Sequence, residues 1–327
     1  MRIDLVFPVL PPRLDGIGDH TARLARALAR RGHDVRVLTG HDQTGDLGGV
    51  DIVGAFDLSP IWKITDLVRT VREAPPDWLF LQFNQFSYGR YGFNPWLPLT
   101  LRKIRRGIPD IRIAMMAHEE FVPANTLRNI VMTTWQRTQF WALGQIAELI
   151  GYSTSSWIDK FRPWFPTTPA CHLPVGSNLP LSPLTRDEAR AKFELRAPFV
   201  IGYFGSVSGS RYLDHIRSSL QKLDGDASER IEFLYIGRHG SALRDALPGL
   251  PVRDLGALPA PDAADAFAAM DLYLAPFVAG VSTRRGSFMA ALQHGVPTVA
   301  TAGTQTDPIL HRNDGNAFVL RPETDVD

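Results

Sequence analysis

The fold is decided by the opening of the chain, residues 2–39, which read RIDLVFPVLPPRLDGIGDHTARLARALARRGHDVRVLT. The apolar run Arg2–Phe7 predicts a buried strand, and the Pro- and Gly-rich segment after it predicts a loop. Apolar side chains then recur at helical spacing from Asp19 to Arg31, and Asp34–Thr39 alternates like a second strand. A strand, a glycine loop, a helix and a strand in this order predict a Rossmann-type unit.

The same alternation continues to residue 152 and predicts a doubly wound parallel sheet, which binds ligands at the carboxyl ends of its strands. The expected strands are Asp51–Ala55, Trp78–Phe83, Ile111–Ala117 and Leu149–Tyr152. The expected helices are Ile61–Glu73, Leu97–Arg106 and an amphipathic Thr126–Ile146.

A proline-rich break, Phe161–Pro183, predicts a linker, after which the alternation restarts. We therefore expect an α/β protein with two Rossmann-like, doubly wound domains facing a cleft, residues 1–180 and 181–327. The second domain is expected to hold strands Phe199–Phe204, Ile231–Ile236, Val252–Leu255, Leu272–Ala275 and Thr298–Ala300. Its expected helices are Asp187–Glu194, Tyr212–Leu223, Ser241–Leu247, Asp262–Ala269 and Gly286–His294.

The composition is that of a globular enzyme, with 44% apolar and 21% charged residues among 327. The net charge of +1 provides no field for nucleic acid, so we expect no such partner. A single cysteine, Cys171, excludes an internal disulfide. The chain opens without a charged-then-apolar leader and has no apolar run of about 20 residues, so we expect a cytoplasmic protein.

Three loops at strand ends have the composition of an anion site. Gly16 and Gly18 precede the first helix, whose N-terminal amides and dipole attract phosphate, although a plain tight turn explains them equally well. In the second domain a strand ends at Gly205 and Ser206, and Arg211 begins the next helix. The third loop combines amides, hydroxyls and guanidinium groups at a helix start, which suits a diphosphate. Its candidate residues are Ser282, Arg284, Arg285, Gly286 and Ser287. The alternative is that Arg284 and Arg285 are a solvated charge pair on a surface turn.

A polar and aromatic segment follows the strand Trp78–Phe83 and suits a cyclic polar acceptor. The residues of this segment that we expect to contact the acceptor are Asn84, Gln85, Tyr88 and Arg90. Glu119, after a later strand, is expected to contact it as well. Packing beneath the helix that begins near Pro95 is the alternative. The tryptophans at 135, 141, 157 and 164 favour core or groove lining, and peripheral membrane contact stays open.

We expect no metal and no cofactor. Asp224 and Asp226 form an Asp-x-Asp pattern, but their surroundings indicate a surface turn, and the histidines lack ligand spacing. The segment from Gly205 to Gly209 only partly matches a nucleophile elbow, and no acid and histidine follow it in hydrolase order.

Several of these segments resemble one family. The endings Arg31–Val35 and Ala117–Glu119 resemble the Arg-Gly-His-x-Val and His-Asp segments of the retaining GT-B glycosyltransferases that include sucrose synthases and phosphatidylinositol mannosyltransferases (glycosyltransferase family 4-like). Arg211 lies where that family has a phosphate-binding lysine. The similarity extends over nearly the whole chain and includes Leu255–Leu258, Met270–Leu272 and Gly295–Pro297.

The chain also departs from the family pattern. Ser206 replaces a phosphate-binding arginine, and Ser282 and Ala290 stand where the family has two glutamates. The chain ends soon after Pro322, so we expect the family's terminal helices to be absent.

The resemblance implies metal-independent transfer of a sugar from a nucleotide-diphosphate sugar to an acceptor hydroxyl, and we expect the anomeric configuration to be retained. His118 would line the donor sugar, Arg211 would neutralise the diphosphate, and Leu258 would contact the base. The partners would be the nucleotide sugar and a sugar or small-molecule acceptor. A catalytically inactive nucleotide-binding member and a nucleotide-sugar epimerase stay open as alternatives.

Overall fold

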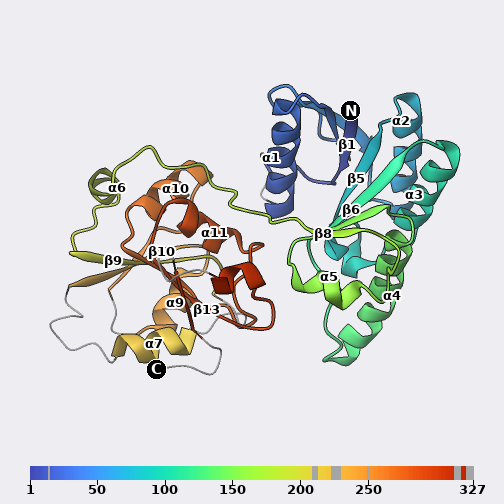
Figure 1. Cartoon of the computed structure of the whole chain (residues 1–327). Helices are drawn as coiled ribbons and strands as arrows, with labels where there is room; N and C mark the ends of the chain where they lie inside the picture. The colour runs from blue at the N-terminus through green and yellow to red at the C-terminus, as the bar shows by residue number, and fades with distance from the viewer. Residues whose placement is uncertain (14, 208–212, 222–229, 249–250, 313–317, 322–327) are drawn as a thin grey trace. The chain divides into compact units, whose positions relative to one another are not determined.

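The computed structural model describes the whole chain except residues 14, 208–212, 222–229, 249–250, 313–317 and 322–327. The chain divides into two compact units, Met1–Leu173 and Pro174–Asp327 (Figure 1). We call them unit 1 and unit 2. None of the helices in the described ranges is both long and apolar enough to cross a membrane.

Unit 1 contains an eight-stranded sheet of order β3-β4-β2-β1-β5-β6-β7-β8, in which only the short β3 pairs antiparallel with its neighbour. The strands are β1 Arg2–Val6, β2 Asp34–Gly40, β3 Gly45–Asp46, β4 Asp51–Phe56, β5 Trp78–Phe83, β6 Arg112–Ala117, β7 Leu149–Tyr152 and β8 Ala170–His172. β3 and β8 were not expected from the sequence, because two or three residues carry no periodic signal. β8 lies within the segment expected to be a linker.

The helices of unit 1 are α1 Gly16–Arg30, η1 Ile61–Asp66, α2 Leu67–Glu73, η2 Gln85–Ser87, η3 Arg90–Gly92, α3 Trp96–Gly107, α4 Leu127–Gly144 and α5 Ser156–Phe161. They lie on both faces of the sheet, with α1 on one side and α2 and α3 on the other (Figure 1). Leu5, Val35 and Val37 pack with α1, and a larger apolar cluster lies between the opposite face and α2–α5. The expected helix Ile61–Glu73 is divided into η1 and α2.

A buried ion pair interrupts this apolar sheet. Asp4 of β1 is fully buried, and its carboxylate accepts hydrogen bonds from Nε (2.9 Å) and Nη2 (2.6 Å) of Arg36 on β2. The same Nη2 donates to the carbonyl oxygen of Ala74. Burial raises the pKa of the Asp4 carboxyl even though Arg36 lies beside it.

Unit 2 contains a six-stranded parallel sheet of order β11-β10-β9-β12-β13-β14. Its strands are β9 Phe199–Phe204, β10 Ile231–Ile236, β11 Val252–Asp254, β12 Leu272–Ala275, β13 Thr298–Thr301 and β14 Phe318–Arg321. Its helices are α6 Arg186–Lys192, α7 Leu213–Gln221, α9 Gly240–Ala246, α10 Ala260–Ala268, α11 Gly286–Gln293 and η4 Pro308–Arg312.

The strand order places one reversal point in each sheet. In unit 1 the chain runs outward from β1 through β2 in one direction and from β5 onward in the other. In unit 2 the corresponding neighbours are β9 and β12. The carboxyl ends of these central strands are where doubly wound sheets bind ligands, and in unit 2 they lead into the loops that begin at Gly205 and Pro276.

Candidate functional site

The loop after β9 is held by buried tyrosines. Gly205 has φ +121°, a conformation that favours glycine, and its carbonyl oxygen accepts a hydrogen bond from the Tyr235 hydroxyl at 2.9 Å. The carbonyl oxygen of Ser206 accepts one from the Tyr203 hydroxyl at 2.8 Å. The Ser206 side chain is exposed, so its hydroxyl is available at the carboxyl edge of the sheet.

The loop between β12 and α11 is anchored to the segment that follows β13. The Asp307 carboxylate accepts hydrogen bonds from the backbone N–H (2.7 Å) and the hydroxyl (2.8 Å) of Thr283. The Arg284 guanidinium donates to the Gln305 side-chain oxygen. The Val281 N–H donates to the Thr301 carbonyl at 3.0 Å. The loop is therefore fixed at three points by the neighbouring strand end.

Two arginines and a serine occupy the start of α11. Arg285 is the residue that immediately precedes the helix, and its guanidinium lies 4.6 Å from the centre of the Phe277 ring. Arg284, Arg285, Gly286 and Ser287 are all partly exposed. Guanidinium groups beside the N–H groups of a helix start form a positive region suited to phosphate oxygens.

The two positions that would carry glutamates in the resembled family are both buried. Ala290 is fully buried on the inner side of α11, and Ser282 is fully buried in the loop. The Ser282 hydroxyl makes no hydrogen bond to any residue in the described part of the chain. Neither position can supply a carboxylate, so a ligand at this loop would meet the two arginines instead.

The other residues of unit 2 predicted from the sequence either pack against the core of the unit or lie outside the described residues. Leu258 packs against the main core of the unit and is only partly exposed. Arg211 lies outside the described residues, as do Asp224 and Asp226. The structure thus brings Ser282, Arg284, Arg285, Gly286 and Ser287 together where one loop enters α11.

In unit 1 the predicted His118 follows β6 and is buried. Its Nε2 lies 2.8 Å from the side-chain oxygen of Gln82 on β5, and its ring meets the His20 ring edge to face at 5.2 Å. Burial, with a smaller contribution from His20, lowers the pKa of His118 to about 3. The imidazole is therefore neutral at neutral pH, and Nε2 carries its hydrogen because a carbonyl oxygen can only accept.

Gln82 is a functional neighbour that the sequence interpretation missed. It is fully buried, and its side-chain nitrogen has no hydrogen-bond partner in the ranges that the structure describes. Its only trace in the sequence is that it is the one polar residue of the strand WLFLQF (78–83), which gives no periodic signal. The sequence interpretation also missed Gln305 and Asp307, which follow the end of β13 in unit 2 and anchor the loop before α11.

The structure corrects the basis of the predicted phosphate loop at Gly16 and Gly18. The Asp15 carboxylate caps α1 and accepts hydrogen bonds from the N–H groups of Ile17 and Gly18, both at 2.9 Å. These two amides are therefore occupied by the Asp15 side chain and are not free to bind a phosphate. Gly18 is required for packing, because a Cβ there would lie 2.4 Å from the Val9 carbonyl oxygen.

The expected acceptor residues do not form one surface. Tyr88 is corrected to a core residue, since it is buried and its hydroxyl donates to the carbonyl oxygens of Val6 (2.9 Å) and Gln82 (3.0 Å). Gln85 is also buried. Asn84 caps η2 through its side-chain oxygen.

Two of the expected acceptor residues are exposed, Arg90 and Glu119. Arg90 lies in η3, and Glu119 follows His118 after β6. These two side chains, with the partly exposed Asn84, are the accessible part of the predicted acceptor set.

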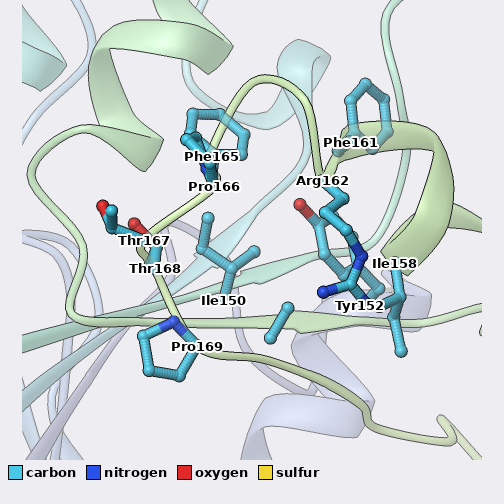
Figure 2. A pocket seen from close by; sticks show the side chains of 11 residues that line it. Ile150, Tyr152, Ile158, Phe161, Arg162, Phe165, Pro166, Thr167, Thr168 and Pro169 are labelled. Atoms are coloured by element: carbon cyan, nitrogen blue, oxygen red, sulfur yellow. The ribbon is translucent and has the colours of Figure 1, made fainter.

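A separate cavity of about 230 Å³ lies beside α5 and the sheet edge (Figure 2). Its lining combines apolar side chains, including Ile150, Phe161 and Phe165, with the polar Thr167 and Thr168 and the Arg162 guanidinium. Burial raises the pKa of the Tyr152 hydroxyl, so this group stays protonated. None of the residues predicted from the sequence lines this cavity. Within the described ranges, no group of three or more His, Cys, Asp or Glu side chains is arranged to hold a metal ion.

Comparison with known proteins gives matches among solved structures only. Neither a protein-family model nor a curated protein matches the chain. Sucrose-phosphate synthase from Thermosynechococcus elongatus is similar with a TM-score of 0.68 and 14% identity, over 99% of this chain and 86% of that one. WaaG, a glycosyltransferase involved in lipopolysaccharide biosynthesis, is similar with a TM-score of 0.65 and 18% identity, over 98% of this chain and 86% of that one.

A third similar structure is the UDP-forming α,α-trehalose-phosphate synthase from Burkholderia xenovorans, with a TM-score of 0.63 and 12% identity over 100% of this chain and 90% of that one. This chain has the GT-B fold. The expected fold class, α/β with parallel sheets in two Rossmann-like units, is confirmed. At identities this low the structural similarity shows the fold alone, so the chemistry has to be argued from the residues of this chain.

Proposed function

We propose that this protein is a glycosyltransferase that moves a sugar from a nucleotide-diphosphate sugar to an acceptor hydroxyl. The support from the fold is that the similar structures with the GT-B fold are glycosyl-transferring enzymes and are matched over nearly the whole chain. A starch synthase IV catalytic domain from Arabidopsis thaliana, solved with ADP and acarbose, is also similar, with a TM-score of 0.62.

The observation that carries the proposal is the anchored loop between β12 and α11. Breaking a glycosyl bond to a nucleotide diphosphate builds negative charge on the leaving phosphate. Arg284 and Arg285 hold fixed positive charge at the carboxyl edge of the sheet, and contacts to Gln305 and Phe277 restrict both side chains. Groups that are oriented before the reaction stabilise the developing charge without further reorganisation. The arginines would supply the charge that a metal supplies in metal-dependent transferases, so we propose metal-independent transfer.

In unit 1, His118 would act as a neutral hydrogen-bonding group. Its Nε2–H is directed to Gln82, which leaves Nδ1 as the acceptor of the neutral ring. A pKa of about 3 excludes His118 as a general acid at neutral pH. We propose that it orients a sugar hydroxyl, and that the accessible Asn84, Arg90 and Glu119 contribute to acceptor binding. Retention of the anomeric configuration is part of this proposal.

A thermal-shift screen with UDP, GDP, ADP and dTDP tests the donor site. A nucleotide at a hundred times its dissociation constant stabilises the protein by about 2.7 kcal/mol, which raises the melting temperature by several degrees. We expect one nucleotide to do so for the parent, equally well in EDTA, and Arg285→Ala and Arg211→Ala to lose most of the shift. Arg196→Ala is the matched control, because Arg196 is exposed near the amino end of β9, at the opposite edge of the sheet. No shift with any nucleotide, or equal loss in the control, would refute the donor site.

A second candidate function is nucleotide binding without transfer. It is favoured by the residue types at positions 282 and 290, since Ser282 and Ala290 stand where the resembled family has two glutamates. Incubation of the protein with the matching nucleotide sugar and a panel of sugar acceptors separates the two functions. A glycosylated product supports transfer, whereas binding of the nucleotide with no product and no hydrolysis supports the inactive alternative.

A further inference from the structure

Helix α4 presents apolar side chains to solvent and polar side chains to the interior. Its exposed apolar residues are Leu127, Ile130, Val131 and Trp141, with Leu127 84% and Val131 57% exposed. Spacings of 3, 4 and 14 residues place all four along one side of the helix over about 21 Å. The opposite side is buried and includes Thr133, Gln136 and Gln139 as well as apolar residues. We call the exposed side the α4 outer face.

Hydrogen bonds from the buried glutamines fix this orientation. The Gln136 side chain donates to the Tyr91 carbonyl (3.1 Å) and accepts from the Val122 N–H (3.0 Å). The Gln139 side chain donates to the Gly92 carbonyl (2.7 Å) and accepts from the Asn94 N–H (2.5 Å). Turning α4 to bury its apolar side would break all four bonds and leave buried polar groups unpaired. The exposure of the apolar side is therefore imposed by the fold.

Helix η3 extends the same surface. Tyr91 has φ +57°, a left-handed conformation that a tyrosine adopts only at a cost, and its ring is exposed. The guanidinium groups of Arg90 and Arg128 lie 4.9 Å and 5.1 Å from the centre of that ring. The exposed Phe93 ring packs edge to face on Trp135 of α4 at 5.8 Å. Aromatic rings and arginines are thus interleaved beside the α4 outer face.

The charged residues of η3 and α4 themselves are all basic: Arg90, Arg128 and Arg137. Segments 78–109 and 121–147 carry seven arginines and lysines and no acidic residue, in a chain of net charge +1, so the rest of the chain has a net charge of −6. Arg90, Arg128 and Arg137 form no ion pair with any residue that the structure describes. Near the C-terminal end of α4, Arg137 and Trp141 line a shallow hollow with Pro163 and Trp164. Arg128 and Arg137, which are exposed and have no role at the proposed transfer site, are available to an anionic partner.

We propose that the α4 outer face, with Tyr91 and Phe93, docks on a bilayer surface that contains anionic lipid. Aliphatic and aromatic side chains bordered by arginines suit the boundary between headgroups and acyl chains, where the apolar groups insert and the guanidinium groups meet phosphates. A second copy of the chain fits poorly, because a two-fold contact would bring Arg90, Arg128 and Arg137 of one copy against the same three arginines of the other. Nucleic acid provides no counterpart for the aliphatic Leu127, Ile130 and Val131. The site is independent of the proposed donor loop in unit 2.

The test is co-sedimentation of the full chain with vesicles of phosphatidylcholine alone or with 30% phosphatidylglycerol. We expect binding to the anionic vesicles that is at least tenfold tighter and that weakens with salt. Ile130→Ser/Val131→Ser and Arg128→Gln/Arg137→Gln should each reduce binding about tenfold or more. The matched controls are Leu181→Ser/Ile309→Ser and Arg30→Gln/Arg69→Gln, which change equally exposed residues elsewhere and should bind as the parent does.

Three outcomes would overturn the proposal. These are no binding to either vesicle, equal weakening in the control variants, and concentration-dependent self-association that the α4 variants abolish. The last result would assign the surface to a second copy. Melting temperatures of all variants, which change exposed side chains only, show whether a loss of binding reflects loss of the fold.

Discussion

His118 illustrates how strongly the surroundings of one residue determine its chemistry. A histidine is usually half protonated near pH 6.5, but this one is buried beside His20 and its pKa falls to about 3. The Gln82 side chain, itself buried, fixes which ring nitrogen carries the hydrogen. The residue is therefore held as a neutral hydrogen-bonding group over the whole physiological pH range.

The lowered pKa of His118 predicts a specific dependence of stability on pH. Between about pH 6.5 and pH 3 the unfolded chain binds a proton at this residue that the folded chain excludes, so the free energy of unfolding falls as the pH falls. The contribution lost by pH 5 is about 2 kcal/mol. In urea titrations the stability gap between the parent and His118→Asn should therefore narrow by this amount from pH 7.5 to pH 5.

The control for this measurement is His311→Asn, which changes an exposed histidine. The same titrations of this variant show how much of any change comes from replacing a surface histidine rather than the buried one. If the gap for His118→Asn were constant, the neutral, buried state of His118 would be wrong.

For single residues, the sequence predicted which side chains lie in the loops at strand ends, but not whether those side chains point to solvent or into the core. Arg284 and Arg285 were placed in one loop at a helix start, and the structure has them there. Tyr88 was assigned to acceptor binding, because residue type does not show that a loop turns a ring into the core. Gln82 and Asp307 were missed, since a single polar residue at a strand end has no periodic signal.

At the scale of elements, the long strands and helices were predictable because their apolar periodicity is strong. Helix α4 shows what periodicity leaves undecided. The sequence predicted an amphipathic helix over Thr126–Ile146, but periodicity does not show which side of the helix packs against the sheet. In the structure the buried side contains Thr133, Gln136 and Gln139. The hydrogen bonds to η3 decide the orientation, and they join residues about 45 positions apart in the chain.

The start of α11 permits a substitution that tests ligand approach separately from stability. A Cβ added at Gly286 would meet no atom within 4 Å, so Gly286→Ala should leave the free energy of unfolding unchanged or raise it by up to about 1 kcal/mol. If a diphosphate contacts the backbone there, the same methyl group should weaken nucleotide binding tenfold or more by calorimetric titration. Gly295→Ala, at the other end of the helix with φ +65°, should instead lower stability and keep affinity. Unchanged affinity in Gly286→Ala would place the ligand elsewhere.

At the scale of the whole molecule, each unit has its own sheet and its own apolar core. We expect differential scanning calorimetry to resolve two unfolding transitions. The nucleotide that binds the loop of unit 2 should raise the temperature of one transition and leave the other unchanged. A single transition that shifts as a whole would contradict independent cores.

The positive charge of the segments around α4 affects how the protein approaches an anionic bilayer as well as how it binds there. Unit 1 holds 20 basic and 16 acidic residues, and outside segments 78–109 and 121–147 its acidic residues outnumber the basic ones by three. The net positive charge of unit 1 thus comes from the segments that contain η3, α3 and α4, and the rest of the unit is net negative. Near a negatively charged surface unit 1 experiences a torque before contact, within roughly 10 Å at ordinary ionic strength. Electrostatics would set the arrival angle, and the apolar side chains would set how long the molecule stays.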